Sequence, residues 1–315
     1  MQVKTQDTHH EDILDEILDG LKKSPKRLPT KLFYDKKGSQ LFDKICELDE
    51  YYPTRTELKI LDDNIEEIAS YFGDDCVLVE LGSGSSIKIR LLIDHLPTLA
   101  AYVPVDISSE HLVYSVECLK ADHPGLNVYP LVADYTKEFA LPVINEKYKT
   151  IDAFYPGSTI GNFTPDKARS FLERIANTCG KNSGLLIGVD LKKEKSVLDA
   201  AYNDSKGITA EFNLNILNHI NSLVNANFDI DKFSHQAFYN ENYGRIEMHL
   251  ISQENQEVQI NDEMISFGKD ENILTEYSYK YSLQDFKKLV DCIYDVEKIW
   301  VDDNRLFSVQ FLRAV

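Results

Sequence analysis

The sequence has few cysteines, and none occurs in a pattern that binds metal or exchanges electrons. The five cysteines are scattered, with no two at the spacing of a zinc knuckle or a redox motif. The eight histidines include no His-Glu-x-x-His motif or similar ligand pair. We therefore expect reduced, structural thiols and no metal site.

Long apolar runs and positive charge are also scarce. No stretch approaches the roughly 20 apolar residues of a membrane span, and residues 1–12 are polar, unlike a signal peptide. The 34 basic residues are outnumbered by 52 acidic residues, which gives a net charge of −18. Such a surface disfavours nucleic acid and anionic membrane as partners and is compatible with a small zwitterionic or cationic ligand. We expect a cytoplasmic protein, and a monomer, because nothing in the sequence implies an oligomer.

Apolar strands and helices alternate through the middle of the chain. We expect strands at 76–81, 102–106, 126–133, 151–155 and 184–189, and intervening helices at 87–95, 109–120 and 167–178. This alternation predicts βαβ units and an α/β fold with a parallel sheet. Residues 296–301 and 306–312 predict a terminal antiparallel hairpin. A parallel sheet that ends in such a hairpin resembles the Rossmann-like class I methyltransferase sheet.

The remaining segments predict a second, smaller α+β lobe. Amphipathic helices are expected at 11–21, 37–49 and 55–71, with a loop at 22–31 and a break at 51–54. A late segment should contain a helix at 209–224 and β segments near 233–240, 244–252, 258–267 and 275–281. We therefore divide the chain into a cofactor-binding domain, 57–191 and 281–315, and a substrate-binding lobe, 1–56 and 192–280. The substrate pocket is expected between them, since ligand sites favour such junctions.

A glycine-rich turn, Glu80-Leu81-Gly82-Ser83-Gly84-Ser85-Ser86, follows the first expected strand. Glycines let the backbone turn tightly and approach a ligand closely. The dinucleotide motif G-x-G-x-x-G needs a glycine three residues after Gly84, where this chain has Ile87. The turn therefore favours S-adenosylmethionine over a pyrophosphate-bearing cofactor, and an ordinary strand-to-helix turn is the alternative.

Further polar side chains fall at the same edge of the expected sheet, where α/β proteins bind ligands. Asp106 ends the second strand, a position suited to a ribose diol; the alternative is a helix N-cap. Asp134 and Tyr135 follow the third strand and offer a carboxylate and an aromatic face to adenine; the alternative is a plain loop. Lys88 lies in the first turn of a helix, where the dipole disfavours a cation. This position suggests a ligand carboxylate nearby, that of the methionine moiety.

Long motifs of the chain resemble the histidine-specific N-α-methyltransferases of ergothioneine biosynthesis. They are KLFYDKKGSQLFDKICELDEYYPTRTE (31–57), VELGSGSS (79–86), FYPGSTIGNF (154–163), GVDLKKEKSVLDAAYND (188–204), GRIEMHL (244–250) and TEYSYKY (275–281). The resemblance implies S-adenosylmethionine-dependent trimethylation of the α-amino group of L-histidine to hercynine, a step toward ergothioneine. The alternative is an N-methyltransferase of the same fold that acts on another aromatic amino acid or a derived amine, such as tryptophan.

The resemblance also implies site residues, position by position. The cofactor site would contain Tyr34, Gly82, Lys88, Asp106, Asp134 and Tyr135. The amino-acid backbone would be held by Tyr51, Gly157, Asn162 and Tyr202, and the imidazole by Met248, Glu276 and Ser278. Tyr51 and Asn162 are the expected catalytic residues, which orient the amine rather than deprotonate it. Tyr135 stands where the family pattern has phenylalanine, and Tyr279 replaces a smaller residue.

The residues assigned to the imidazole suit its chemistry. Glu276 and Ser278 are two apart on an expected strand, so both side chains point to one face. A carboxylate and a hydroxyl can bind the two ring nitrogens and select the tautomer, while Met248 supplies a deformable apolar wall. Without the resemblance, Met248 would be interpreted as a core residue, and Glu276 and Ser278 as residues of a solvated strand face. The three match the histidine-specific pattern, which favours histidine over tryptophan-derived amines.

Overall fold

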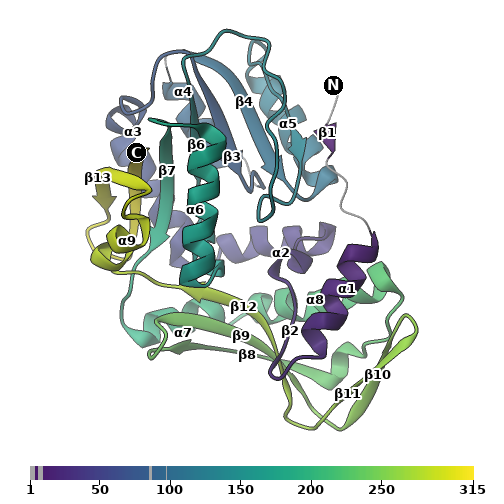
Figure 1. Ribbon diagram of the computed structural model, residues 1–315. Coiled ribbons are helices and arrows are strands. Elements are labelled where there is room, and N and C mark those ends of the chain that lie inside the picture. Colours follow the sequence, from purple (N-terminus) through teal and green to yellow (C-terminus); the bar gives the residue numbers. More distant parts are fainter. Residues whose placement is uncertain (1–3, 6–9, 85–86, 97) are drawn as a thin grey trace. The chain divides into compact units, whose positions relative to one another are not determined.

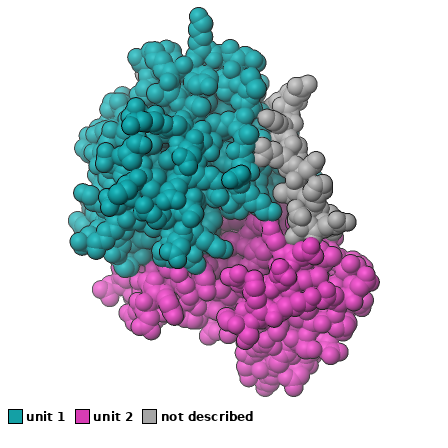
Figure 2. Space-filling view, viewed as in Figure 1, with its two compact units in different colours: residues 1–7, 53–192, 280–315 teal, residues 8–52, 193–279 magenta. Residues whose placement is uncertain are grey.

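The computed structural model describes residues 4–5, 10–84, 87–96 and 98–315. Ser85 and Ser86 of the glycine-rich turn therefore lie outside the described residues. The chain forms two compact units, coloured separately in Figure 2. Unit 1 contains residues 1–7, 53–192 and 280–315, and unit 2 contains residues 8–52 and 193–279. The functional division expected from the sequence stays a prediction.

An eight-stranded sheet forms the centre of unit 1, in the order β1-β5-β4-β3-β6-β7-β14-β13 (Figure 1). The strands are β1 (Lys4–Thr5), β3 (Cys76–Leu81), β4 (Leu99–Asp106), β5 (Leu131–Val132), β6 (Thr150–Tyr155), β7 (Gly184–Asp190), β13 (Tyr294–Val301) and β14 (Phe307–Ala314). β14 pairs antiparallel with both β7 and β13, whereas the other neighbours are parallel. β3 and β7 bury every side chain, as parallel strands covered on both faces do. The predicted class I methyltransferase sheet with its terminal hairpin is confirmed.

Helices pack on both faces of this sheet. They are α3 (Tyr52–Ala69), α4 (Ile87–His95), α5 (Ser109–Asp122), α6 (Pro165–Cys179) and α9 (Leu283–Val290), with the short 3-10 helix η2 (Thr159–Asn162). In Figure 1, α6 lies in front of β6 and β7, whereas α3 and α4 are fainter and more distant. Ile68 of α3 and Leu92 of α4 share a buried core with Leu78 of β3 and Phe311 of β14. The amphipathic stripe expected at 55–71 therefore faces the sheet.

Three expectations for the helices need correction. The break expected at 51–54 lies earlier, between Cys46 and Tyr52, because α3 begins at Tyr52 and takes Pro53 into its first turn, where a missing N–H is tolerated. α9 was not expected from the sequence, although Ser282 and Asp285 form a capping box that marks its start. α7 (Lys195–Tyr202) in unit 2 was also missed.

Unit 2 contains a four-stranded sheet in the order β2-β12-β9-β8 and a separate hairpin. The sheet strands are β2 (Lys26–Arg27), β8 (Phe233–Asn240), β9 (Arg245–Ser252) and β12 (Asn272–Tyr279), and the hairpin strands are β10 (Gln256–Ile260) and β11 (Glu263–Phe267). The helices are α1 (His10–Leu21), α2 (Lys36–Cys46), α7, α8 (Ile208–Val224), η1 (Thr30–Phe33) and η3 (Ile230–Lys232). The single β segment expected at 258–267 is wrong, because Asn261 adopts a positive φ of 51° between two strands. The loop expected at 22–31 contains β2.

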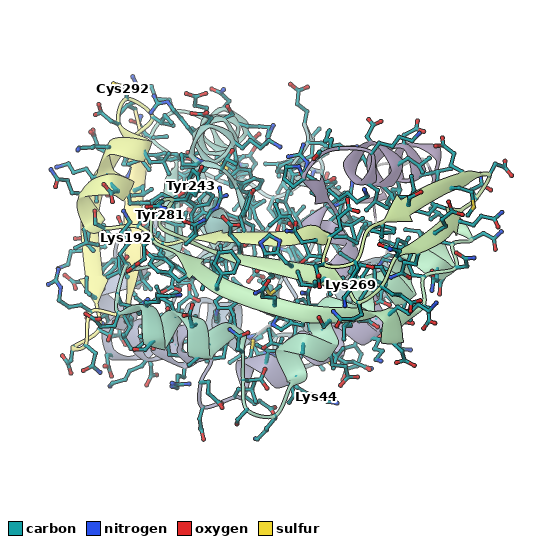
Figure 3. All side chains as sticks on the ribbon, turned by 90° about the horizontal axis from the view of Figure 1, so that it is seen from below. Lys44, Lys192, Tyr243, Lys269, Tyr281 and Cys292 are labelled. Carbon is teal, nitrogen blue, oxygen red and sulfur yellow. The ribbon has the colours of Figure 1, made fainter. Side chains whose placement is uncertain are left out.

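The segment 193–279 leaves and rejoins unit 1 at neighbouring positions. The Lys192 N–H donates to the Tyr281 carbonyl at 3.0 Å, and the Tyr281 N–H donates to the Asp190 carbonyl at 3.1 Å. Lys192 and Tyr281 are labelled near each other in Figure 3. The Lys280 ammonium lies 2.7 Å from the Asp190 carboxylate, and each of these side chains is only 1% exposed. A buried ion pair thus joins the two points where the chain passes between the units.

Candidate active site

The glycine-rich turn lies at the carboxyl end of β3. Gly82 has a φ of 76°, a conformation that residues with a Cβ rarely adopt, and its N–H donates to the Val105 carbonyl at 2.9 Å. A Cβ on Gly82 would lie 3.3 Å from the Tyr135 hydroxyl. Glycine is therefore favoured here both by the backbone and by the close approach of Tyr135. The turn, the end of β4 and Tyr135 meet at one edge of the sheet.

Two carboxylates lie at this edge. Asp106 accepts the Ser108 N–H at 2.8 Å, and Asp134 accepts the Thr136 N–H at 3.0 Å. Burial raises the pKa of Asp106, and the hydrogen bond from Ser108 opposes that shift. Ser108, not Asp106, is the N-cap residue of α5, so the capping alternative for Asp106 is wrong. Gly82, Asp106 and Tyr135, three of the predicted cofactor residues, are thus brought together within unit 1.

The surroundings of the turn fit a ligand with polar groups. Ser83 is 2% exposed, and its hydroxyl makes no hydrogen bond to any residue that the structure describes. A buried hydroxyl left without a partner costs about 1–3 kcal/mol. The nearest atom to a Cβ built on Gly84 is His111 Nε2, at 3.8 Å, so the backbone there is approachable. These features suit the ribose and amino-acid parts of S-adenosylmethionine.

Lys88 faces a carboxylate that belongs to the protein itself. Its ammonium lies 2.5 Å from Glu57 Oε2, on α3, and the Glu57 side chain is 1% exposed. The Gly157 N–H donates to both carboxylate oxygens of Glu57, at 3.0 and 2.9 Å. A ligand carboxylate is therefore not needed to explain a cation in the first turn of α4. Sequence reasoning missed Glu57, although it stands one turn before Leu61 on the buried stripe of α3.

Gly157 and Asn162 follow β6 at the same end of the sheet. Gly157 has a φ of 78°, and a Cβ there would lie 3.8 Å from the Lys88 ammonium nitrogen. Because its N–H is bound to Glu57, Gly157 offers a ligand its carbonyl and its lack of a side chain. Asn162 ends η2 and is half-buried. Its amide can both donate and accept, which suits a carboxylate or an amine.

Glu80 of β3 and Tyr102 of β4 form a buried pair on neighbouring strands. Glu80 lies two residues before Gly82. The Tyr102 hydroxyl donates to Glu80 Oε2. Burial raises the pKa of Glu80 to about 8, although the bond from Tyr102 and the charge of Lys88 lower it. Glu80 is therefore largely protonated in the folded protein at neutral pH.

A Glu80→Gln variant is expected to gain stability relative to the unaltered protein as the pH rises. Glutamate ionises near pH 4.5 in the unfolded chain and near 8 in the folded protein, so unfolding releases a proton between these values. The contribution of Glu80 to the stability of the unaltered protein therefore falls from about pH 5 to about pH 8, whereas glutamine does not titrate. Thermal unfolding of both proteins at each pH measures the difference, and a constant difference contradicts the assignment.

Within unit 2, Tyr51 and Tyr202 lie beside the sheet residues predicted to bind the imidazole. The Tyr202 hydroxyl donates to Ser278 Oγ at 3.0 Å, and the Tyr51 and Tyr202 rings meet edge to face at 6.2 Å. Burial raises the pKa of Tyr51 well above its usual value, and Tyr202, Cys46 and Glu276 raise it further. Tyr51 therefore stays protonated at neutral pH, which suits a hydrogen-bonding role rather than that of a base.

Glu276, Ser278 and Met248 occupy one face of the unit 2 sheet. Glu276 pairs directly with Met248 across β12 and β9, and a bulge between Leu274 and Glu276 sets this register. Directly paired residues share a face, as do residues two apart on a strand. Glu276 is 9% exposed, Ser278 4% and Met248 1%. The solvated-face alternative is therefore wrong, and the sheet buries a carboxylate and a hydroxyl beside an apolar side chain.

The predicted site residues fall into two groups. The first group belongs to unit 1: Gly82, Lys88, Asp106, Asp134, Tyr135, Gly157 and Asn162. The second group belongs to unit 2: Tyr34, Tyr51, Tyr202, Met248, Glu276 and Ser278. Tyr34 is the one predicted cofactor residue in unit 2, where its ring lies 6.0 Å from that of Phe42 and 6.2 Å from that of Phe212.

The described residues also bear on metal binding and on membrane insertion. Across the described ranges, no group of three His, Cys, Asp or Glu side chains is arranged to hold a metal ion. No helix in those ranges is both long and apolar enough to cross a bilayer.

Comparison with known proteins identifies the family. The family model described as "Histidine-specific methyltransferase, SAM-dependent" matches residues 13–314. The chain is 39% identical to the histidine N-alpha-methyltransferase of Mycobacterium tuberculosis, covering 89% of this chain and 87% of that protein. It is 33% identical to ergothioneine biosynthesis protein 1 of Neurospora crassa, covering 80% of this chain and 30% of that protein. It is 29% identical to 4-dimethylallyltryptophan N-methyltransferase easF of Aspergillus fumigatus, covering 85% and 84%. The chain therefore belongs to the S-adenosylmethionine-dependent, histidine-specific methyltransferase family.

Proposed function

We propose that this protein trimethylates the α-amino group of L-histidine to give hercynine, a step toward ergothioneine. The observation that carries the proposal is the buried group of Glu276, Ser278 and Met248 on one face of the unit 2 sheet. The Glu276 carboxylate and the Ser278 hydroxyl can form hydrogen bonds with the two nitrogens of an imidazole, and the Met248 thioether can pack against the ring carbons. The curated relatives named for histidine methylation support the same substrate.

We assign the cofactor to unit 1. Asp106 would hold the ribose hydroxyls, and Asp134 and Tyr135 the adenine, while Gly82 lets the backbone approach the ligand. Lys88 would meet the carboxylate of the methionine moiety. Tyr34, implied by the resemblance, completes the set as a prediction. When bound, S-adenosylmethionine supplies the sulfonium methyl group that is transferred.

The protein's part in the reaction is positioning. An in-line displacement needs a neutral amine whose lone pair points at the methyl carbon, and a fixed geometry lowers the barrier. A peptide α-amine has a pKa of about 8 and that of a free amino acid is somewhat higher, so a minor fraction of the amine is neutral at physiological pH. Tyr51 and Asn162, with Gly157 and Tyr202, would hold the amino-acid end of histidine and orient the amine. The protons that leave before each transfer pass to water.

Mass spectrometry tests the proposal directly. Incubation with S-adenosylmethionine and L-histidine is expected to add three methyl groups to histidine and to convert the cofactor to S-adenosylhomocysteine. Tryptophan and 4-dimethylallyltryptophan, tested in parallel, address the alternative that similarity to easF raises. Methylation of either compound in preference to histidine would overturn the substrate assignment.

A further inference from the structure

The buried carboxylate of Glu57 connects three separate parts of unit 1. It lies on α3, pairs with Lys88 of α4 at 2.5 Å, and accepts the Gly157 N–H of the segment after β6 with both oxygens. A fourth element leaves room for it: a Cβ on Gly188 of β7 would lie 2.0 Å from Glu57 Oε1. Any side chain at Gly188 would displace the carboxylate.

Two features of this arrangement lower the stability of the fold: the burial of a carboxylate and a glycine inside a strand. A buried carboxylate is unfavourable without a counter-charge and hydrogen bonds, and glycine within a strand weakens that strand. Glu57 obtains its counter-charge from Lys88 and its hydrogen bonds from Gly157. In return Glu57 holds the Lys88 ammonium through the ion pair and ties the Gly157 backbone to α3.

An ammonium has three N–H donors, of which the contact with Glu57 uses one. The side chain of Lys88 is 15% exposed, so solvent or a ligand can reach it. Lys88 also lies 3.8 Å from the position of a Cβ on Gly157, so the cation and the glycine border the same space. A carboxylate in that space would meet an ammonium that is already held in place.

We propose that Glu57 is a positioning residue of the cofactor site, which holds the Lys88 ammonium where it receives the carboxylate of S-adenosylmethionine and ties the neighbouring Gly157 backbone to α3. This inference rests on the proposed function. Glu57 does not touch the cofactor in this scheme, and it acts through Lys88, which does.

Two cofactor analogues separate positioning from general stability. S-adenosylhomocysteine carries the amino-acid end, whereas 5′-methylthioadenosine has the same nucleoside without it. Titration calorimetry on Glu57→Gln is expected to show S-adenosylhomocysteine bound roughly 10- to 100-fold more weakly. The reason is that Lys88 is no longer held in place, so its charge-assisted bond to the ligand carboxylate is lost. The affinity for 5′-methylthioadenosine should be unchanged. Lys88→Met as a single substitution should weaken S-adenosylhomocysteine binding. Added to Glu57→Gln, it should have little further effect.

Glu66→Gln is the matched control, because Glu66 lies on the same helix and its side chain is 89% exposed. It should leave both affinities unchanged. If Glu57→Gln does not fold, Glu57→Asp keeps the charge but shortens its reach, and the same selective loss is expected. Equal weakening of both analogues, or no weakening of either, would overturn the inference. If the unaltered protein binds S-adenosylhomocysteine but methylates no histidine, the proposed function fails and the Glu57 test still stands.

Discussion

Alanine in place of Glu276 is expected to raise the KM for histidine by roughly 5- to 150-fold. Glu276 is 9% exposed on β12, so a histidine ring in this position would lose a buried acceptor for its N–H. Such a loss costs about 1–3 kcal/mol, and each 1.4 kcal/mol is tenfold in affinity. Steady-state kinetics at saturating S-adenosylmethionine measure the effect, while the affinity for S-adenosylhomocysteine should not change.

Two comparison variants sharpen this test. Glu276→Gln keeps an acceptor oxygen but loses the charge, so its KM should lie between those of the unaltered protein and of Glu276→Ala. Glu257→Ala removes an exposed carboxylate from β10 in the same unit and should have no effect. An unchanged histidine KM in Glu276→Ala would mean that the imidazole is bound elsewhere.

Lys280→Ala is expected to lower the free energy of unfolding by about 3–5 kcal/mol. It removes the counter-charge of Asp190 at a position where both side chains are 1% exposed. Breaking a buried ion pair from one side has this cost because the remaining charge stays out of water. Chemical denaturation measures the loss.

The loss of stability should come from burying the Asp190 carboxylate without the Lys280 charge, rather than from the loss of their mutual attraction. Lys280→Met combined with Asp190→Leu removes both charges and should recover much of the stability. Lys59→Ala breaks a surface pair with Asp63 in which the two side chains are 67% and 53% exposed, and it should cost far less because solvent screens exposed charges. If Lys280→Ala costs no more than Lys59→Ala, the buried pair contributes little.

Local patterns predicted β3, β6 and β7 of the large sheet to within one residue, whereas β1 was missed and the strand expected at 126–133 is only Leu131–Val132. β3 and α4 have the expected bounds, because a short apolar run, two glycines and a helical stripe follow one another without ambiguity. Elements in the less regular parts were harder to predict. α7 is one of them: it has eight residues and only three buried side chains, too few for a clear stripe. The sequence predicted one β segment where the structure has the β10–β11 hairpin, because the turn at Asn261 contains no glycine.

The candidate site shows a similar limit. Gly82 and Asp106 could be predicted because their positions at strand ends follow from the chain order alone. The contacts of Glu57 could not be predicted, because they depend on Lys88 and Gly157, which are 31 and 100 residues away. The side-chain link from Tyr202 to Ser278, across 76 residues, is likewise a product of tertiary packing.

The place where segment 193–279 joins unit 1 has a consequence for how such enzymes diversify. Its two ends are held side by side by the Lys192–Tyr281 and Tyr281–Asp190 backbone bonds. A replacement segment that starts and finishes at these adjoining points and still packs against residues 8–52 leaves the order of strands in the large sheet undisturbed. The amine recognition that we assign to Glu276, Ser278 and Met248 can therefore change within this insert without altering that strand order.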